Sequence, residues 1–95
     1  MKHQKDPIIE SASLLKAIGH PIRVQIIIAL SRNTIMTVTE LANHLSIHQP
    51  IISLHLGILR KQNVIHAKRE GKQSVYSIKD KSVKQIINIA YNTRS

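Results

Sequence analysis

Three residue types that often shape small proteins are absent from this sequence of 95 residues: it contains no cysteine, no tryptophan and no phenylalanine. Without cysteine the chain can form no disulfide, no thiol redox sensor and no zinc site built on thiolates. Tyr76 and Tyr91 are the only tyrosines, so the core must be built from isoleucine, leucine, valine and alanine. No apolar run approaches the roughly 20 residues that span a bilayer, and the first residues, MKHQKDP, lack the apolar segment of a signal peptide. We therefore expect a cytoplasmic protein.

Acidic residues are also scarce, since five Asp and Glu stand against 14 Lys and Arg and give a formal net charge of +9. There is no glycine-rich phosphate loop, no cysteine nucleophile and no acidic pair expected to share a pocket, so we expect neither enzymatic activity nor a cofactor. The carboxylates are better explained as helix caps and surface charges. The positive charge favours nucleic acid or a membrane surface as partner. Because the basic residues are spread over several elements, and not along one face of a long amphipathic helix, nucleic acid is favoured and a membrane role is not expected.

The N-terminal third of the chain is predicted to form two helices. Residues 1–6 are expected to be a flexible tail. Asp6, followed by proline, marks the start of a helix that continues to Ile18 and ends at Gly19. A second helix, with apolar residues at helical spacing, is expected at about residues 20–31.

The most informative segment, residues 41–59, is predicted to form two short helices joined by a tight turn at residues 46–47. The capping box Thr37-x-x-Glu40 opens the first of them. The second is expected at about residues 48–61, with an aliphatic stripe facing the core. Since a helix-turn-helix places its second helix in the major groove of DNA, this segment indicates a DNA-binding regulator.

After this second helix the apolar pattern changes from helical spacing to alternation. Residues 64–69 and 74–78 are predicted to be two strands joined by a turn at residues 70–72. Asp80 then caps a last helix whose apolar residues recur at helical spacing. The order α-α-α-α-β-β-α predicts a mostly α fold in one domain: a winged helix-turn-helix with a two-stranded wing and a C-terminal dimerisation helix.

Three segments resemble the ArsR/SmtB-type winged-helix repressors. They are LLKAIGHPIRVQIIIAL at residues 14–30, HQPIISLHLGILRKQNVI at residues 48–65 and KREGKQSVYSI at residues 68–78. The segments follow the family's order and spacing, and the resemblance covers roughly residues 12–90. It implies a homodimer that binds a palindromic operator in double-stranded DNA and leaves it when an inducer binds.

The sequence departs from this family at the metal-sensing positions. Where one site type has a Cys-x-Cys-like element, this chain has Thr37 and Thr39. Where the other has Asp-x-His on the last helix, Asp80 is present but Ser82 replaces the histidine, and Thr93 lies near the place of a downstream histidine. One possible ligand out of four cannot hold zinc well. We therefore expect a regulator without the usual metal site, whose effector is unknown.

The residues expected to contact DNA lie on the second helix of the helix-turn-helix and on the hairpin. Gln49 and Ser53 would contact bases or phosphates, with a solvated helix face as the alternative. His55 would bond a phosphate or, equally well, be a structural histidine packed near the wing. Arg60 could simply complement the helix dipole, and the hairpin cations would reach the minor groove or protect a sheet edge. The expected set is His48, Gln49, Pro50, Ser53, His55, Arg60, Lys68, Arg69 and Lys72.

The first and last helices carry more apolar surface than one small domain needs, which predicts that they form a homodimer interface. The expected interface residues are Ile8, Leu15, Val83, Ile86, Ile87 and Ala90. Two rival functions remain open. One is a repressor of the same fold that answers to an unidentified non-metal effector or partner. The other is a winged-helix module that binds protein through the same helix, although a net charge of +9 argues against it.

Overall fold

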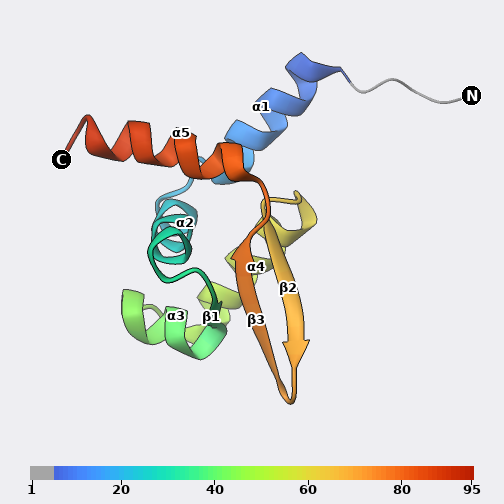
Figure 1. The fold of residues 1–95 in the computed structure, drawn as a ribbon, viewed down its shortest axis with the longest axis vertical. Coiled ribbons are helices and arrows are strands. Elements are labelled where there is room, and N and C mark those ends of the chain that lie inside the picture. Colours follow the sequence, from blue (N-terminus) through green and yellow to red (C-terminus); the bar gives the residue numbers. More distant parts are fainter. Residues whose placement is uncertain (1–5) are drawn as a thin grey trace, which may run out of the picture.

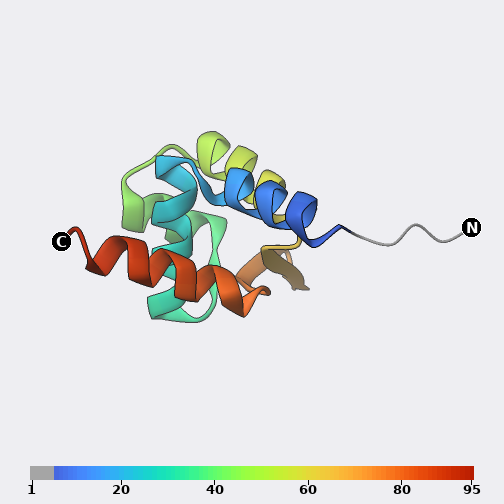
Figure 2. The ribbon, with the colours of Figure 1, turned by 90° about the horizontal axis from the view of Figure 1, so that it is seen from above.

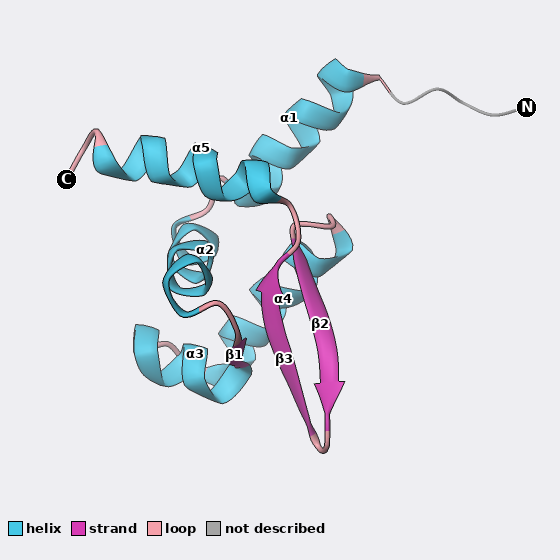
Figure 3. Ribbon diagram, in the orientation of Figure 1, coloured by secondary structure: helices cyan, strands magenta, loops and turns pink. Residues whose placement is uncertain are grey.

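The computed structural model describes residues 6–95, which form five helices and a small antiparallel sheet (Figure 1 and Figure 3). In chain order the elements are α1 (Pro7–Ile18), α2 (Pro21–Asn33), β1 (Met36–Thr37), α3 (Val38–Leu45), α4 (Gln49–Lys61), β2 (Ile65–Glu70), β3 (Gln73–Ile78) and α5 (Lys81–Asn92). The predicted helices and hairpin are thus present near their expected positions. Of the expected tail, residues 1–5 lie outside the described residues.

The sheet contains a short strand, β1, that the predicted order α-α-α-α-β-β-α lacks. Met36 and Thr37 pair with Tyr76 and Val75 of β3 in antiparallel register, and the strand order is β1-β3-β2. A strand of two residues is too short to produce an alternating pattern, so periodicity could not reveal it. The pairing holds the middle of β3 against the start of α3.

The helix starts follow the predicted caps. Asp6 and Asp80 each accept a backbone N–H of the following turn, at 2.9 and 3.0 Å. Thr37 and Glu40 form the expected capping box, in which the Thr37 hydroxyl accepts the Glu40 N–H and the Glu40 carboxylate accepts the Thr37 N–H. His48 occupies the expected position before α4, although its side chain makes no capping hydrogen bond within residues 6–95.

Two positive-φ residues set the turn before α4 and the turn of the hairpin. Ser46 is left-handed, with φ of 56°, and ends α3 so that α4 can begin three residues later. Gly71 has φ of 62° and lies in the two-residue turn between β2 and β3. Glycine adopts this conformation without steric cost, which makes so tight a turn possible.

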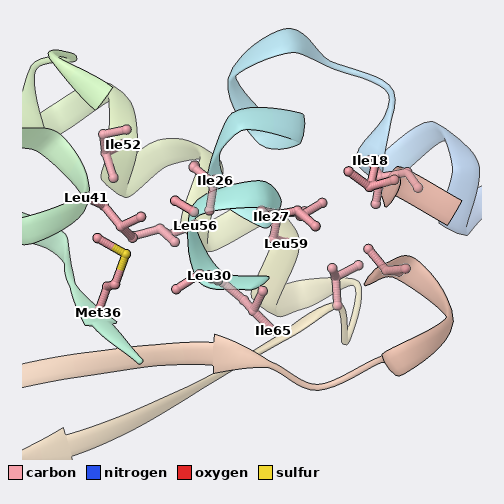
Figure 4. Packing of buried hydrophobic residues seen from close by; sticks show 14 of the residues in the cluster. Ile18, Ile26, Ile27, Leu30, Met36, Leu41, Ile52, Leu56, Leu59 and Ile65 are labelled. Carbon is pink, nitrogen blue, oxygen red and sulfur yellow. The ribbon is translucent and has the colours of Figure 1, made fainter. Parts of the chain in front are cut away.

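The hydrophobic core is centred on α2, whose Ile26 and Ile27 have no exposed surface. They pack with Leu41 of α3 and with Ile52 and Leu59 of α4 (Figure 4). One cluster of buried residues contains members from all five helices and from the sheet. The core is therefore aliphatic, as the lack of large aromatic residues predicted.

The arrangement of the helices separates two ends of the molecule. Seen from above, α2 lies between α4 and α5 (Figure 2). α1 and α5 lie at one end, and the tip of the hairpin lies at the other (Figure 1). No single helix in the described range is long and apolar enough to cross a membrane; α1 and α2 together have the length, but they are bent by 91° and the apolar residues of α2 fill the core.

Candidate nucleic-acid interface

α4 has one face in the core and one face in solvent. The predicted aliphatic stripe, Ile52, Leu56 and Leu59, is buried. Pro50, Ser53, Leu54, Gly57, Arg60 and Lys61 are exposed. The helix is therefore held by the core along one side and is free along the other, which is the arrangement that entry into a DNA groove requires.

The first turn of α4 is tied to α3 through Gln49. Its side-chain Nε2 donates a hydrogen bond to the hydroxyl of Thr39, at 2.6 Å. Gln49, His48 and Ser53 are exposed, as the predicted contact to DNA requires. Since an amide carries two N–H donors and a carbonyl acceptor, Gln49 keeps groups for a further polar contact while it also links α3 to α4.

His55 does not lie on the exposed face, so the expectation that it contacts DNA is wrong. Its side chain is only 7% exposed, its Nδ1 accepts a hydrogen bond from Nε of Arg23 at 3.2 Å, and its ring lies 4.5 Å from the ring of His20. The structural alternative is correct, although the contacts of His55 are with α2 and its N-cap and not with the wing. Burial, followed by the nearby His20 and Arg23, lowers the pKa of His55 below 6.5.

Arg23 is a residue whose structural role the sequence analysis missed. Its Nη1 donates to the carbonyl of Ala17 at 3.0 Å, while its Nε donates to His55. His20 completes the group, because its Nδ1 accepts the N–H of Ile22 and so caps α2. One guanidinium thus connects α1, α2 and α4. The available signal was a single arginine between aliphatic neighbours at the start of a helix.

The hairpin presents the predicted cations to solvent. Lys68, Arg69 and Lys72 are exposed at or near its tip. Nε of Arg69 donates to the carbonyl of Gly71 at 3.1 Å, which holds that side chain over the turn. Arg60 is exposed in the last turn of α4, where it also complements the helix dipole. The end of α4 and the tip of the hairpin therefore both present exposed cations.

The dimer residues expected on α5 are only partly at the surface. Val83 is fully buried and Ile87 is 5% exposed, so both belong to the core of the single chain and offer a partner almost no surface. Their assignment to an interface is therefore corrected. Ile86 is half-buried and Ala90 is exposed, as are Ile8 and Leu15 of α1. On α1 and α5, the large exposed apolar residues outside the expected interface set are Ile9, Ile89 and Tyr91.

The positions that match the family's metal sites have structural contacts of their own. Thr37 forms the capping box of α3. Asp80 accepts hydrogen bonds from the N–H and the hydroxyl of Ser82. In the part of the chain that the structure describes, no group of three or more His, Cys, Asp or Glu side chains could hold a metal ion.

Comparison with known proteins independently supports the winged helix-turn-helix fold and a role in the regulation of transcription. The family model described as "Bacterial regulatory protein, arsR family" matches residues 20–67. A protein of Methanocaldococcus jannaschii, named as an uncharacterised HTH-type transcriptional regulator, is 39% identical over 80 residues, which cover 84% of this chain and 90% of the relative. The crystal structure of the transcriptional repressor BigR from Xylella fastidiosa is similar with a TM-score of 0.83 and 31% identity, over 90% of this chain and 87% of that one. The transcriptional repressor PagR of Bacillus anthracis is similar with a TM-score of 0.81 and 31% identity, over 87% and 94% of the two chains.

Proposed function

Because the chain belongs to the ArsR family of bacterial regulatory proteins, we propose that it represses transcription as a homodimer bound to double-stranded DNA. Two structural relatives, BigR and PagR, are named transcriptional repressors, and this chain shares their fold along most of its length. In the proposed complex α4 enters the major groove, and the β2–β3 hairpin contacts the minor groove or the flanking phosphates.

The exposed face of α4 is the observation that carries this proposal. Ser53 and its exposed neighbours on α4 face away from the core, and Arg60 and Lys61 follow at the end of the helix. The hairpin adds Lys68, Arg69 and Lys72. A helix with a free face beside a basic hairpin suits the width of the major groove and the charge of the phosphates on its edges.

We propose that exposed aliphatic residues of α1 and α5 form the homodimer interface. Ile8 is 78% exposed and Ile89 is 68% exposed, and such surface is costly to leave in water. Because α1 and α5 lie at the end opposite the hairpin tip (Figure 1), a two-fold dimer formed there leaves both hairpins free. Such a dimer would bind a palindromic operator with two half-sites about one helical turn apart.

The proposed repressor is not a zinc sensor of the usual family types. The hydroxyls of Thr37 and Thr39 are neutral and are poor ligands for soft metals, and both already make hydrogen bonds. Ser82 offers no imidazole beside Asp80. We therefore expect the effector, where the protein has one, to be a non-metal molecule or a partner macromolecule.

A salt titration of DNA binding tests this function. The full chain would be titrated with a labelled duplex of random sequence at several salt concentrations. The logarithm of affinity should fall linearly with the logarithm of salt concentration, by about 0.9 for each phosphate contacted. A salt-independent affinity, or no binding at low salt, would reject DNA as the partner.

A further inference from the structure

The outermost line of α4 is almost devoid of hydrogen-bonding groups. At about 100° per residue, Pro50, Leu54, Gly57 and Lys61 follow one another along the side opposite the buried stripe. All four are exposed. A side chain on this line approaches the base pairs most closely when the helix lies in a groove. Yet the first three residues offer no side-chain donor or acceptor to the edge of a base.

Leu54 is the main side chain on this line. It is 62% exposed on a helix whose other leucines are buried. Ile51, one turn earlier, is a second exposed aliphatic residue beside it. At Gly57 a Cβ atom would meet nothing within 4 Å outside its own helix backbone and neighbours, so this position is open and carries no side chain. The result is an apolar ridge of Pro50, Ile51 and Leu54 with space beside it.

The polar residues of α4 lie to one side of this ridge. Ser53 is on the flank, and Gln49 already donates a hydrogen bond to Thr39. These side chains are better placed to bond the edge of the groove than its floor. Recognition by hydrogen bonds alone would therefore leave the centre of the helix without a function.

We propose that Leu54, with Ile51, recognises the methyl groups of thymine in the major groove, so that the operator half-site of this repressor is rich in A·T pairs at the contacted positions. This inference rests on the proposed function. Thymine is the base that presents an apolar group, its 5-methyl, in the major groove, and aliphatic side chains are its complement. Ser53 and the free groups of Gln49 then bond the flanking bases or phosphates.

The charge around the ridge selects DNA over an apolar protein partner. Arg60 and Lys61 follow it on α4, and the hairpin carries Lys68, Arg69 and Lys72. A protein interface built on Leu54 would have to accommodate these cations at its rim. Duplex DNA provides the phosphates for them and the methyl groups for the ridge in one ligand.

The test replaces thymidine by deoxyuridine, whose base differs from thymine only in lacking the 5-methyl group. The preferred duplex is first selected from a random library by the full chain, and its thymines are then replaced one position at a time. Replacement at each contacted position should weaken binding about fourfold, the factor that corresponds to about 0.8 kcal/mol per buried carbon. Replacement outside the protected site is the control and should have no effect.

Variants assign the effect to the side chain. Leu54→Ala should bind the selected duplex more weakly and should no longer distinguish thymine from uracil at the positions that Leu54 contacts. Ile35→Ala is the control, because Ile35 is also an exposed aliphatic residue, at 49%, and lies between α2 and β1, outside α4, the hairpin and the proposed dimer helices; it should keep the full preference for thymine. Leu54→Gln should select adenine at those positions, since glutamine bonds the adenine edge in the major groove.

The outcomes separate this inference from the function on which it rests. Specific binding that is indifferent to uracil would overturn the methyl recognition and leave the repressor function intact. If Leu54 serves a protein partner instead, Leu54→Ala will leave both the affinity for the selected duplex and its preference for thymine unchanged, which also overturns it. If no duplex binds, the proposed function and this inference are both wrong.

Discussion

Removal of the Arg23 guanidinium is expected to destabilise the whole fold, because this side chain joins three helices. From α2 its Nε donates to His55 of α4, and its Nη1 donates to the carbonyl of Ala17 in α1. In Arg23→Ala both acceptors lose their donor. His55 is buried, so its Nδ1 would have little access to water in exchange.

The size of the effect follows from these two hydrogen bonds. A hydrogen bond from a charged donor contributes about 1.5–3 kcal/mol, and a buried acceptor left alone costs about 1–3 kcal/mol. Arg23 is half-buried, so water can replace part of this stabilisation, and we expect a total decrease of about 2–4 kcal/mol. Since a domain of this length has a free energy of unfolding of about 5–14 kcal/mol, the variant should lose a large share of its stability.

Urea unfolding followed by far-ultraviolet circular dichroism measures this decrease, because the sequence has no tryptophan to report by fluorescence. The urea concentration at the midpoint should fall, while the slope of the free energy against urea concentration stays the same. All variants are compared at one protein concentration, because the stability of a dimer depends on protein concentration. Arg23→Lys should recover one hydrogen bond at most, since an ammonium lacks the planar fork of a guanidinium. Arg23→Met combined with His55→Leu should recover part of the stability by removing both polar partners. A free energy of unfolding for Arg23→Ala within about 0.5 kcal/mol of the wild type would refute this reasoning.

Four further predictions concern the buried histidine, the hairpin, the dimer face and zinc. The lowered pKa of His55 means that the unfolded chain binds the proton more tightly than the folded chain does. The free energy of unfolding should therefore be highest above pH 6.5 and should fall as the pH decreases toward the folded-state pKa. Unfolding measured at several pH values should show a smaller fall for His55→Gln, whereas the exposed His66→Gln should behave as wild type. Arg69→Ala with Lys72→Ala should reduce the slope of log affinity against log salt by about one for each phosphate that the variant no longer neutralises, and an unchanged slope would separate the hairpin from DNA. Ile89→Asp should convert the dimer to monomer in sedimentation, since it introduces a charge into the proposed interface; a persistent dimer would exclude this face. Zinc should neither bind tightly in calorimetry nor release DNA in a binding assay, and submicromolar affinity coupled to release would contradict the expectation.

Local signals predicted the helix boundaries because the interactions that create them are local. The caps at Asp6 and Asp80 and the Thr37–Glu40 capping box each involve groups within three residues of one another. The aliphatic stripe of α4 was also correct, since helical spacing identifies which residues share a face. The same reasoning found the exposed polar residues of α4 and the cations of the hairpin.

Contacts between distant segments were the part that sequence patterns could not supply. β1 exists because two residues pair with β3 near the other end of the chain. Arg23 and His55 are 32 residues apart, and neither position alone predicts the other. On α5 the spacing identified the apolar stripe correctly, but spacing cannot say whether a stripe faces the chain's own core or a partner. Val83 and Ile87 face the core, and the exposed apolar surface of α5 lies beside them at Ile89.

The adjacent residues Leu54 and His55 exchange the roles that their polarity suggests. Hydropathy favours Leu54 for the core and His55 for a polar ligand, yet Leu54 is exposed and His55 is buried against α2. The exchange is possible because successive helical residues point about 100° apart, and because Arg23 supplies the donor that makes a buried histidine stable. Departures from the usual pattern concentrate where a protein has a function to perform. On α4 they place a polar anchor on the side of the core and an apolar ridge on the side that we propose faces DNA.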